Sequence, residues 1–124
     1  MAKILYVEDI RDNITLVEKI VTSRGYEFLF AESAEAGLEL AFTSKPDLIL
    51  LDLGLPDADG QTLSVWLRSN PLLSSIPIIV LTAWPEEVVR QTVNAYNLNG
   101  YLCKPFKLTD LVDMIDSVLG KKSL

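Results

Sequence analysis

Residues 46–56 have the sequence PDLILLDLGLP, and this stretch decides the fold of the chain. Four consecutive large apolar residues, Leu48 to Leu51, lie between Pro46 and the turn residues Gly54 to Pro56. A run this short, bounded by turn residues, is typical of a strand buried on both faces of a sheet. Asp52 ends the run, and open α/β sheets bind ligands beyond the carboxyl ends of their strands. Asp52 is therefore either a ligand-binding carboxylate or an ordinary turn residue.

The composition excludes several classes of protein. A chain of 124 residues with 49% apolar residues can bury the core of one domain. The net charge of −6 argues against direct nucleic-acid binding, and no apolar run approaches the roughly 20 residues that membrane insertion requires. The absence of histidine rules out Ser-His-Asp catalysis, His-ligated zinc and a phosphohistidine in this chain. The single cysteine, Cys103, allows no internal disulfide, so we expect a cytoplasmic location and a buried thiol.

Short apolar runs at residues 3–7, 27–31, 77–81 and 100–103 predict four more strands besides 48–51. Helical patterns separate and follow these strands. The residues that we expect to end or cap the helices are Gly25, Ser33, Pro85 and Gly120. The apolar residues that we expect on the inner helix faces include Ile10, Leu16, Leu38, Phe42, Leu63, Trp66, Val89, Tyr96, Leu108 and Leu111.

Five strands that alternate with five helices predict an α/β fold with a doubly wound, five-stranded parallel sheet. The expected strand order is 2-1-3-4-5, which places the first and third strands side by side at the switch point. Only residues 121–124 follow the last predicted helix, so we expect residues 1–124 to form one domain with no output domain.

Four of the five predicted strands end in a residue suited to phosphoryl chemistry. These residues are Glu8 with Asp9, Asp52, Thr82 and Lys104. Carboxylates that share one crevice repel each other unless a divalent cation joins them, and ligands that are all oxygen favour Mg²⁺, with Mn²⁺ possible. Asp52 could then attack phosphorus and form an acyl phosphate, while Lys104 neutralises charge and Thr82 donates a hydrogen bond.

Each of these residues also has an ordinary structural interpretation. Glu8 and Asp9 could be a solvated helix start, Thr82 a strand-end hydroxyl and Lys104 a surface lysine. Their joint placement at one edge of the sheet favours the functional interpretation. Two more carboxylates, Asp57 and Asp59, are interpreted as turn residues.

With these motifs the chain resembles the receiver domains of two-component response regulators, over essentially its whole length. The matching motifs are VED at 7–9, LLDLGLPDADG at 50–60, LTA at 81–83 and KPF at 104–106. The resemblance implies a flavodoxin-like (βα)₅ fold and a phosphorelay switch. It also implies a histidine kinase or histidine phosphotransfer protein as phosphodonor and a downstream protein as target.

The resemblance implies roles for individual residues. Asp52 would be the phosphoacceptor, and Glu8, Asp9, Asp52 and the backbone carbonyl of Gly54 would arrange Mg²⁺. Lys104 would contact the phosphoryl group.

Thr82 and Tyr101 would form a switch pair that changes the surface of the fourth helix, fifth strand and fifth helix, and the Lys104–Pro105 bond would be cis. The chain carries glycine at position 54, which has no side chain to position a hydrolytic water, and the bulky, apolar residue tryptophan at position 84. We therefore expect slow dephosphorylation.

Three other functions are open from the residues alone. A phosphatase of the haloacid dehalogenase type also uses an aspartyl nucleophile, but its second aspartate would fall at Gly54. A flavodoxin-like cofactor binder would need a phosphate loop where residues 8–12 read EDIRD. A phosphorylation-independent interaction module would not need the complete set of acidic, threonine and lysine residues. We expect no turnover of a diffusible substrate.

Overall fold

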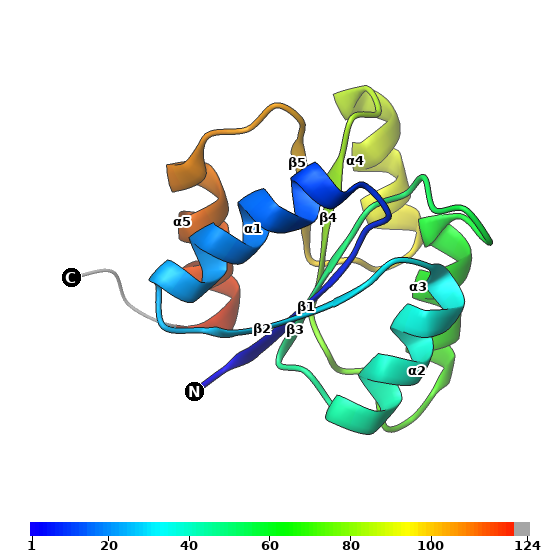
Figure 1. Cartoon of the computed structure of the whole chain (residues 1–124). Helices are drawn as coiled ribbons and strands as arrows, with labels where there is room; N and C mark the ends of the chain where they lie inside the picture. The colour runs from blue at the N-terminus through cyan, green and yellow to red at the C-terminus, as the bar shows by residue number, and fades with distance from the viewer. Residues whose placement is uncertain (121–124) are drawn as a thin grey trace.

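The computed structural model describes residues 1–120, which form one parallel sheet between two layers of helices (Figure 1). The strand order is β2-β1-β3-β4-β5, so the predicted fold class and strand order are confirmed. Residues 121–124, which include the tail predicted after the last helix, lie outside the described residues. The elements in chain order are β1 (Lys3–Val7), α1 (Arg11–Ser23), β2 (Glu27–Ala31), α2 (Ala34–Ser44), β3 (Leu48–Leu51), α3 (Gly60–Ser69), β4 (Ile78–Thr82), α4 (Glu86–Ala95), β5 (Gly100–Cys103) and α5 (Leu108–Leu119).

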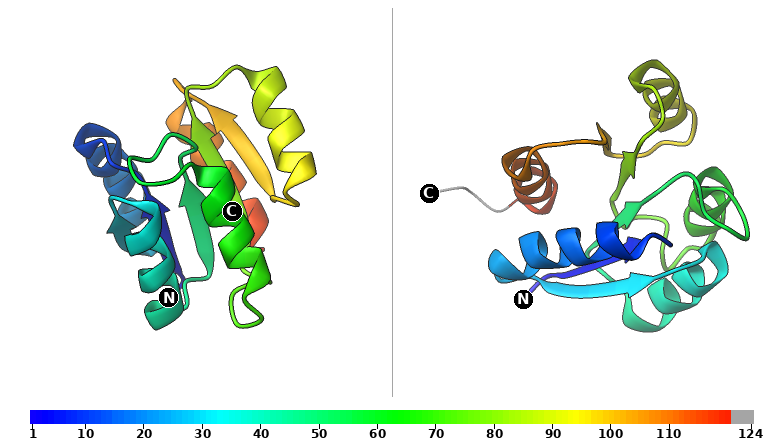
Figure 2. Two further views of the ribbon diagram at one scale, coloured as in Figure 1. Left: turned by 90° about the vertical axis from the view of Figure 1, so that its right-hand side faces the viewer. Right: turned by 45° about the horizontal axis from the view of Figure 1, so that its top comes forward.

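The sheet separates two apolar cores. Helices α1 and α5 cover one face, and α2, α3 and α4 cover the other (Figure 2). Residues of β3 alternate between the two cores: Leu48 and Leu50 pack with α1 and α5, whereas Ile49 and Leu51 pack with the other helices. All four side chains are fully buried, as the opening stretch predicts.

Local chemistry explains where the helices begin and end. The Ser33 side chain accepts a hydrogen bond from the Ala36 N–H and caps α2, as predicted. Gly25 and Gly120 follow α1 and α5 with φ of 83° and 72°, a left-handed conformation that glycine adopts without strain. Pro85 occupies the N-cap position of α4 rather than its first turn.

Five apolar residues predicted to face the core are instead exposed. Two of them, Ile10 and Leu108, lie at the start of a helix, and the other three lie on helix faces directed away from the core. Ile10 is the N-cap of α1, with extended backbone before the first helical turn. The exposed side chains are Ile10, Leu16, Phe42, Trp66 and Leu108.

Three predictions about β5 and its neighbours also need correction. Cys103 is half-buried, because β5 is an edge strand of the sheet. Tyr96 is likewise half-buried and packs against the core. The fourth strand, β4, begins and ends one residue later than predicted, so Thr82 is its last residue.

The predicted turn residues Asp57 and Asp59 cap helices. The Asp57 carboxylate accepts hydrogen bonds from the backbone N–H groups of Ala34 and Glu35, at 2.8 and 2.9 Å, in the first turn of α2. Asp59 is the N-cap of α3 and accepts from the Thr62 N–H at 2.8 Å. The loop between β3 and α3 therefore holds the N-termini of two helices.

Gly60 allows α3 to begin directly against the end of β3. A Cβ atom at Gly60 would lie 2.5 Å from the carbonyl oxygen of Asp52 and 2.9 Å from the Cα of Leu53. Both are backbone atoms, which cannot move aside without displacing the loop. The helix α3 can therefore lie this close to Asp52 only because Gly60 has no side chain.

We expect Gly60→Ala to lower the free energy of unfolding by about 1–3 kcal/mol, because the added methyl group overlaps backbone atoms. Urea denaturation measures the change. The matched control is Gly100→Ala, whose Cβ would meet only the flexible Met114 side chain at 3.4 Å. Equal stability of the two variants would contradict the close approach at Gly60.

Candidate functional site

Three carboxylates meet at the carboxyl ends of β1 and β3. The register pairs Val7 with Leu51, so the residues that follow them, Glu8 and Asp52, leave the sheet side by side. Glu8, Asp9 and Asp52 each offer an oxygen, and these oxygens lie within 4.8 Å of one another. Glu8 and Asp52 are buried, whereas Asp9 is exposed. Three clustered carboxylates with an open side fit a hard divalent cation such as Mg²⁺.

Glu8 is fully buried and is held by a ring of donors. Its Oε1 accepts hydrogen bonds from Lys104 Nζ at 2.7 Å, Asn13 Nδ2 at 2.8 Å and the Tyr6 hydroxyl at 3.0 Å. The Asp9 N–H donates to Oε2 at 3.1 Å. Burial by itself raises the pKa of Glu8, but the hydrogen bonds from Lys104 and Asn13 outweigh it and lower the pKa. Glu8 therefore stays ionised inside the protein.

Two of these donors, Tyr6 and Asn13, were not identified from the sequence. Burial and the neighbouring Glu8 raise the pKa of Tyr6, so its hydroxyl keeps its proton and donates. The period-two spacing of Tyr6 and Glu8, which places them on one side of β1, was an available signal. For Asn13 only its place in the first turn of α1 could have suggested a role.

Asp52 lies in a different electrostatic environment from Glu8. Burial raises the pKa of Asp52 to about 6, Lys104 lowers it in part, and the negative charge of Glu8 raises it again. The Leu53 N–H donates to Asp52 Oδ1 at 2.8 Å and orients the carboxylate. Of the two buried carboxylates, Asp52 has fewer donors than Glu8, which suits a nucleophile that a cation activates.

Thr82 and Lys104 end the next two strands. Thr82 is fully buried, and its Oγ1 accepts a hydrogen bond from the Trp84 N–H at 3.2 Å. The Lys104 N–H donates to the Thr82 carbonyl at 2.7 Å, which fastens the ends of β4 and β5 together. The Lys104–Pro105 peptide bond is cis. The Lys104 ammonium pairs with Glu8, so it lies at the acidic cluster and is no free surface lysine.

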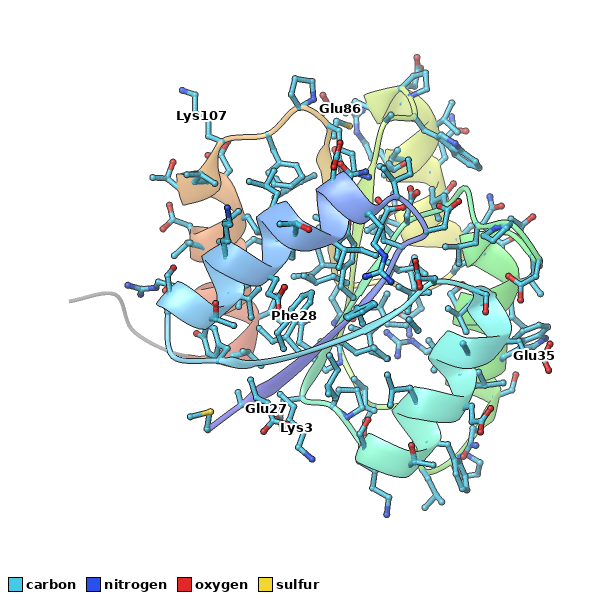
Figure 3. All side chains as sticks on the ribbon, viewed as in Figure 1. Lys3, Glu27, Phe28, Glu35, Glu86 and Lys107 are labelled. Carbon is cyan, nitrogen blue, oxygen red and sulfur yellow. The ribbon has the colours of Figure 1, made fainter. Side chains whose placement is uncertain are left out.

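Tyr101 does not point into this crevice. Its hydroxyl donates to Glu86 Oε1 at 3.2 Å, and Glu86 also pairs with Arg90 at 3.3 Å on α4. Figure 3 shows Glu86 at the end of the molecule where β5 and α4 meet. Gly54 lies exposed in the loop after β3, and a Cβ atom added there would meet nothing within 4 Å.

A cavity of about 410 Å³ lies beside the acidic cluster, between α1 and the segment after β5. Leu16, Val17, Pro105 and Phe106 supply its apolar walls, and Asn13, Lys104 and other residues of the crevice form the side toward the carboxylates. A ligand or partner side chain in this cavity would reach the functional groups directly.

Asp52→Asn should raise the free energy of unfolding by about 2 kcal/mol at pH 7.5 without divalent cations. The folded-state pKa of Asp52, about 6, exceeds its ordinary value of 3.8. The ionised carboxylate therefore lowers the free energy of unfolding, and this effect reaches its full size above pH 6. The difference between the two proteins should shrink as the pH falls through 6 toward 4. Urea denaturation across pH measures it, with Asp113→Asn as an exposed control. A constant difference at all pH values would refute the assignment.

Comparison with known proteins identifies the family. Residues 4–116 match the response regulator receiver domain. The polar-differentiation response regulator DivK of Brucella ovis is 31% identical over 117 residues, 94% of this chain and 95% of DivK. A putative response regulator from Chloroflexus aurantiacus has a TM-score of 0.89 at 32% identity, covering 96% of this chain and 98% of the other.

A further similar structure is the receiver domain of the sensor histidine kinase PA1611 of Pseudomonas aeruginosa, with a magnesium ion coordinated in its active-site cleft. Its TM-score is 0.88 at 31% identity, covering 96% of this chain and 98% of that domain. With the strand order, the acidic cluster and the lysine at the end of β5, these similarities agree on one family. The chain belongs to the receiver domains of two-component response regulators, the phosphorelay switches of signal transduction.

Proposed function

We propose that Asp52 is the phosphoacceptor of this receiver domain. The observation that carries the proposal is the position of Asp52, buried at the end of β3 within reach of two other carboxylates. A carboxylate oxygen of Asp52 attacks phosphorus in line, and the bond from phosphorus to the donor nitrogen of a phosphohistidine breaks. The electron pair of that bond returns to the imidazole, which takes up a proton. The product is an acyl phosphate that water can hydrolyse.

The neighbouring side chains have separate roles in this step. Glu8, Asp9, Asp52 and the Gly54 carbonyl would hold Mg²⁺, which when bound neutralises charge on the phosphoryl oxygens. The Lys104 ammonium, now paired with Glu8, can turn to a phosphoryl oxygen as negative charge builds up there. The Thr82 hydroxyl accepts from Trp84 and keeps its own hydrogen to donate to a second oxygen.

The phosphodonor is proposed to be a histidine kinase or a histidine phosphotransfer protein. A donor has to bring its imidazole to the crevice at the ends of β1 and β3. The cavity beside the cluster, with its walls from α1 and from Pro105 and Phe106, offers apolar contacts at that place. Exposed Leu16 lies on the same rim.

Phosphorylation is proposed to act on partners through Thr82 and Tyr101. A hydrogen bond from Thr82 to the phosphoryl group would draw the hydroxyl toward the crevice and leave space below β4. The Tyr101 ring could fill that space once its hydroxyl leaves Glu86. The surface of α4, β5 and α5 would then change for a downstream protein. A partial shift of this kind requires about 1–3 kcal/mol of differential stabilisation.

We further propose that residues 1–124 constitute a single receiver domain and that it works in the cytoplasm without turnover of a diffusible substrate. A single cysteine, which allows no internal disulfide, supports a reducing compartment. Every helix in residues 1–120 is too short or too polar to cross a lipid bilayer. Multiple turnover on a phosphate ester would favour a phosphatase instead.

Acetyl phosphate with Mg²⁺ should add one phosphoryl group to the wild-type chain and none to Asp52→Asn, as measured by intact mass. The acyl phosphate forms only if the Asp52 oxygen is free to attack and its charge is compensated. Removal of Mg²⁺ with a chelator should abolish the modification. Asp57→Asn is the matched control. Asp57 accepts a hydrogen bond from the α2 backbone and is not the proposed acceptor, so this variant should be phosphorylated like the wild type. Full modification of Asp52→Asn would place the acceptor elsewhere.

The acyl phosphate should persist longer in the wild type than in the double variant Gly54→Asn with Trp84→Glu. Position 54 is open to solvent and bears no side chain, and half-buried Trp84 has no side-chain oxygen, so neither can accept a hydrogen bond from an attacking water. The decay of phosphorylated protein after removal of the donor measures the lifetime. A shorter lifetime in the wild type would contradict this role of the two positions.

A further inference from the structure

An apolar groove lies between α2 and α3, on the sheet face opposite α1 and α5. Its volume is about 420 Å³, and Leu38, Phe42 and Trp66 supply its apolar surface. Phe42 is 49% exposed and Trp66 is 39% exposed. Two large aromatic side chains therefore remain in contact with water across one groove, where a partner side chain could cover both.

Helical spacing explains why these residues share one surface. Glu35, Leu38, Glu39 and Phe42 are at positions i, i+3, i+4 and i+7 of α2 and lie on one face of that helix. Trp66 approaches from α3 across the groove. The inner positions of the two helices, such as Ala41 and Leu67, fill the core beneath. Phe42 of α2 and Trp66 of α3 instead form an outward-facing apolar patch.

The rim of the groove is acidic. Glu35 and Glu39 line it, and Figure 3 shows Glu35 projecting outward from α2. Its other lining residues are neutral. Arg68, the arginine of α3, is bound elsewhere: its guanidinium donates to the carbonyl oxygens of Ile76 and Asn97, at 2.7 and 3.3 Å. Among the described residues that line the groove, two are carboxylates and none is a cation.

We propose that this groove docks a segment of another protein that presents a large apolar side chain flanked by lysine or arginine. The apolar side chain would lie between Phe42 and Trp66, and the cations would face Glu35 and Glu39. A groove of this volume accepts one or two large side chains, so it would serve as the anchor of a modest, transient interface.

Charge argues against the other occupants. In a twofold dimer through this groove, the acidic rims of two copies would meet, and like charges would oppose association. Nucleic acid and anionic membranes would be repelled for the same reason. A basic segment is the occupant for which both the apolar surface and the rim contribute favourably.

This inference goes beyond the proposed phosphoryl transfer. None of Glu35, Leu38, Glu39, Phe42 and Trp66 belongs to the acidic cluster or its donors. Binding at the groove can therefore be tested on unphosphorylated protein. Failure of one proposal leaves the other standing.

The test uses a helical probe peptide with phenylalanine and leucine on one face and lysines beside them, and a matched peptide with glutamates in place of lysines. Titration is followed by NMR of the whole chain, with the indole N–H of Trp66 assigned by Trp66→Phe. We expect the lysine peptide to shift Trp66 and residues of α2, and the glutamate peptide to leave them unchanged.

Variants locate the interaction. Phe42→Ala and the double variant Glu35→Gln with Glu39→Gln should each weaken binding of the lysine peptide about tenfold. Glu18→Gln, an exposed charge on α1, is the control and should bind like the wild type. Equal binding of both peptides, unchanged affinity of Phe42→Ala, or shifts confined to other surfaces would overturn the proposal. So would a dimer, or binding to anionic vesicles, that Phe42→Ala abolishes.

Discussion

The structure depends on the placement of buried negative charge at the ends of β1 and β3. Two parallel strands in register bring Glu8 and Asp52 together where neither can be fully hydrated. Charges in such a position are unfavourable unless they are paired. The protein compensates Glu8 with Lys104, Asn13 and Tyr6, and it leaves Asp52 with less compensation. This asymmetry distinguishes Glu8, which is held by several donors, from Asp52, the proposed phosphoacceptor.

The fold provides this asymmetry through its connections. Lys104 and Glu8 are 96 positions apart in the sequence. They meet because β1 and β5 are strands of one parallel sheet, so their carboxyl ends lie on the same side of the molecule. The loop after Asp52 is equally constrained: Asp57 and Asp59 cap α2 and α3, and Gly60 brings α3 against the Asp52 backbone. The loop that follows Asp52, the proposed phosphoacceptor, is thereby held in place by α2 and α3.

The described part of the chain has three distinct surfaces that could contact partners. The cavity between α1 and Phe106 lies beside the acidic cluster and is the place where we propose that the phosphodonor docks. The contact from Tyr101 to Glu86 lies on the side of α4, where we propose that phosphorylation changes the surface for a downstream protein. The groove between α2 and α3 is built from residues that take no part in either. A small domain can present these surfaces independently because each uses a different pair of neighbouring elements.

Much of this followed from residue order alone. The run LILL, the alternation of apolar strands with amphipathic helices and the polar strand ends predicted the sheet, its strand order and the residues that meet at one edge. Periodicity predicts these features because it reflects which face of an element is buried. It could not show that Phe42 and Trp66 lie outside the core, since a helix can carry a second apolar stripe.

Only the tertiary structure decided the partners of each charge. Tyr6, Asn13 and Lys104 converge on Glu8 from three elements. Hydrogen bonds depend on distances between side chains, and those distances are set by packing between segments that are remote in sequence. Asp57 shows the same limit of sequence-based prediction. Its neighbouring residues indicated only a turn, whereas its carboxylate accepts a hydrogen bond from the backbone of α2, 23 positions earlier in the chain. The sequence determined which functional groups the chain carries, and packing determined which of these groups contact one another.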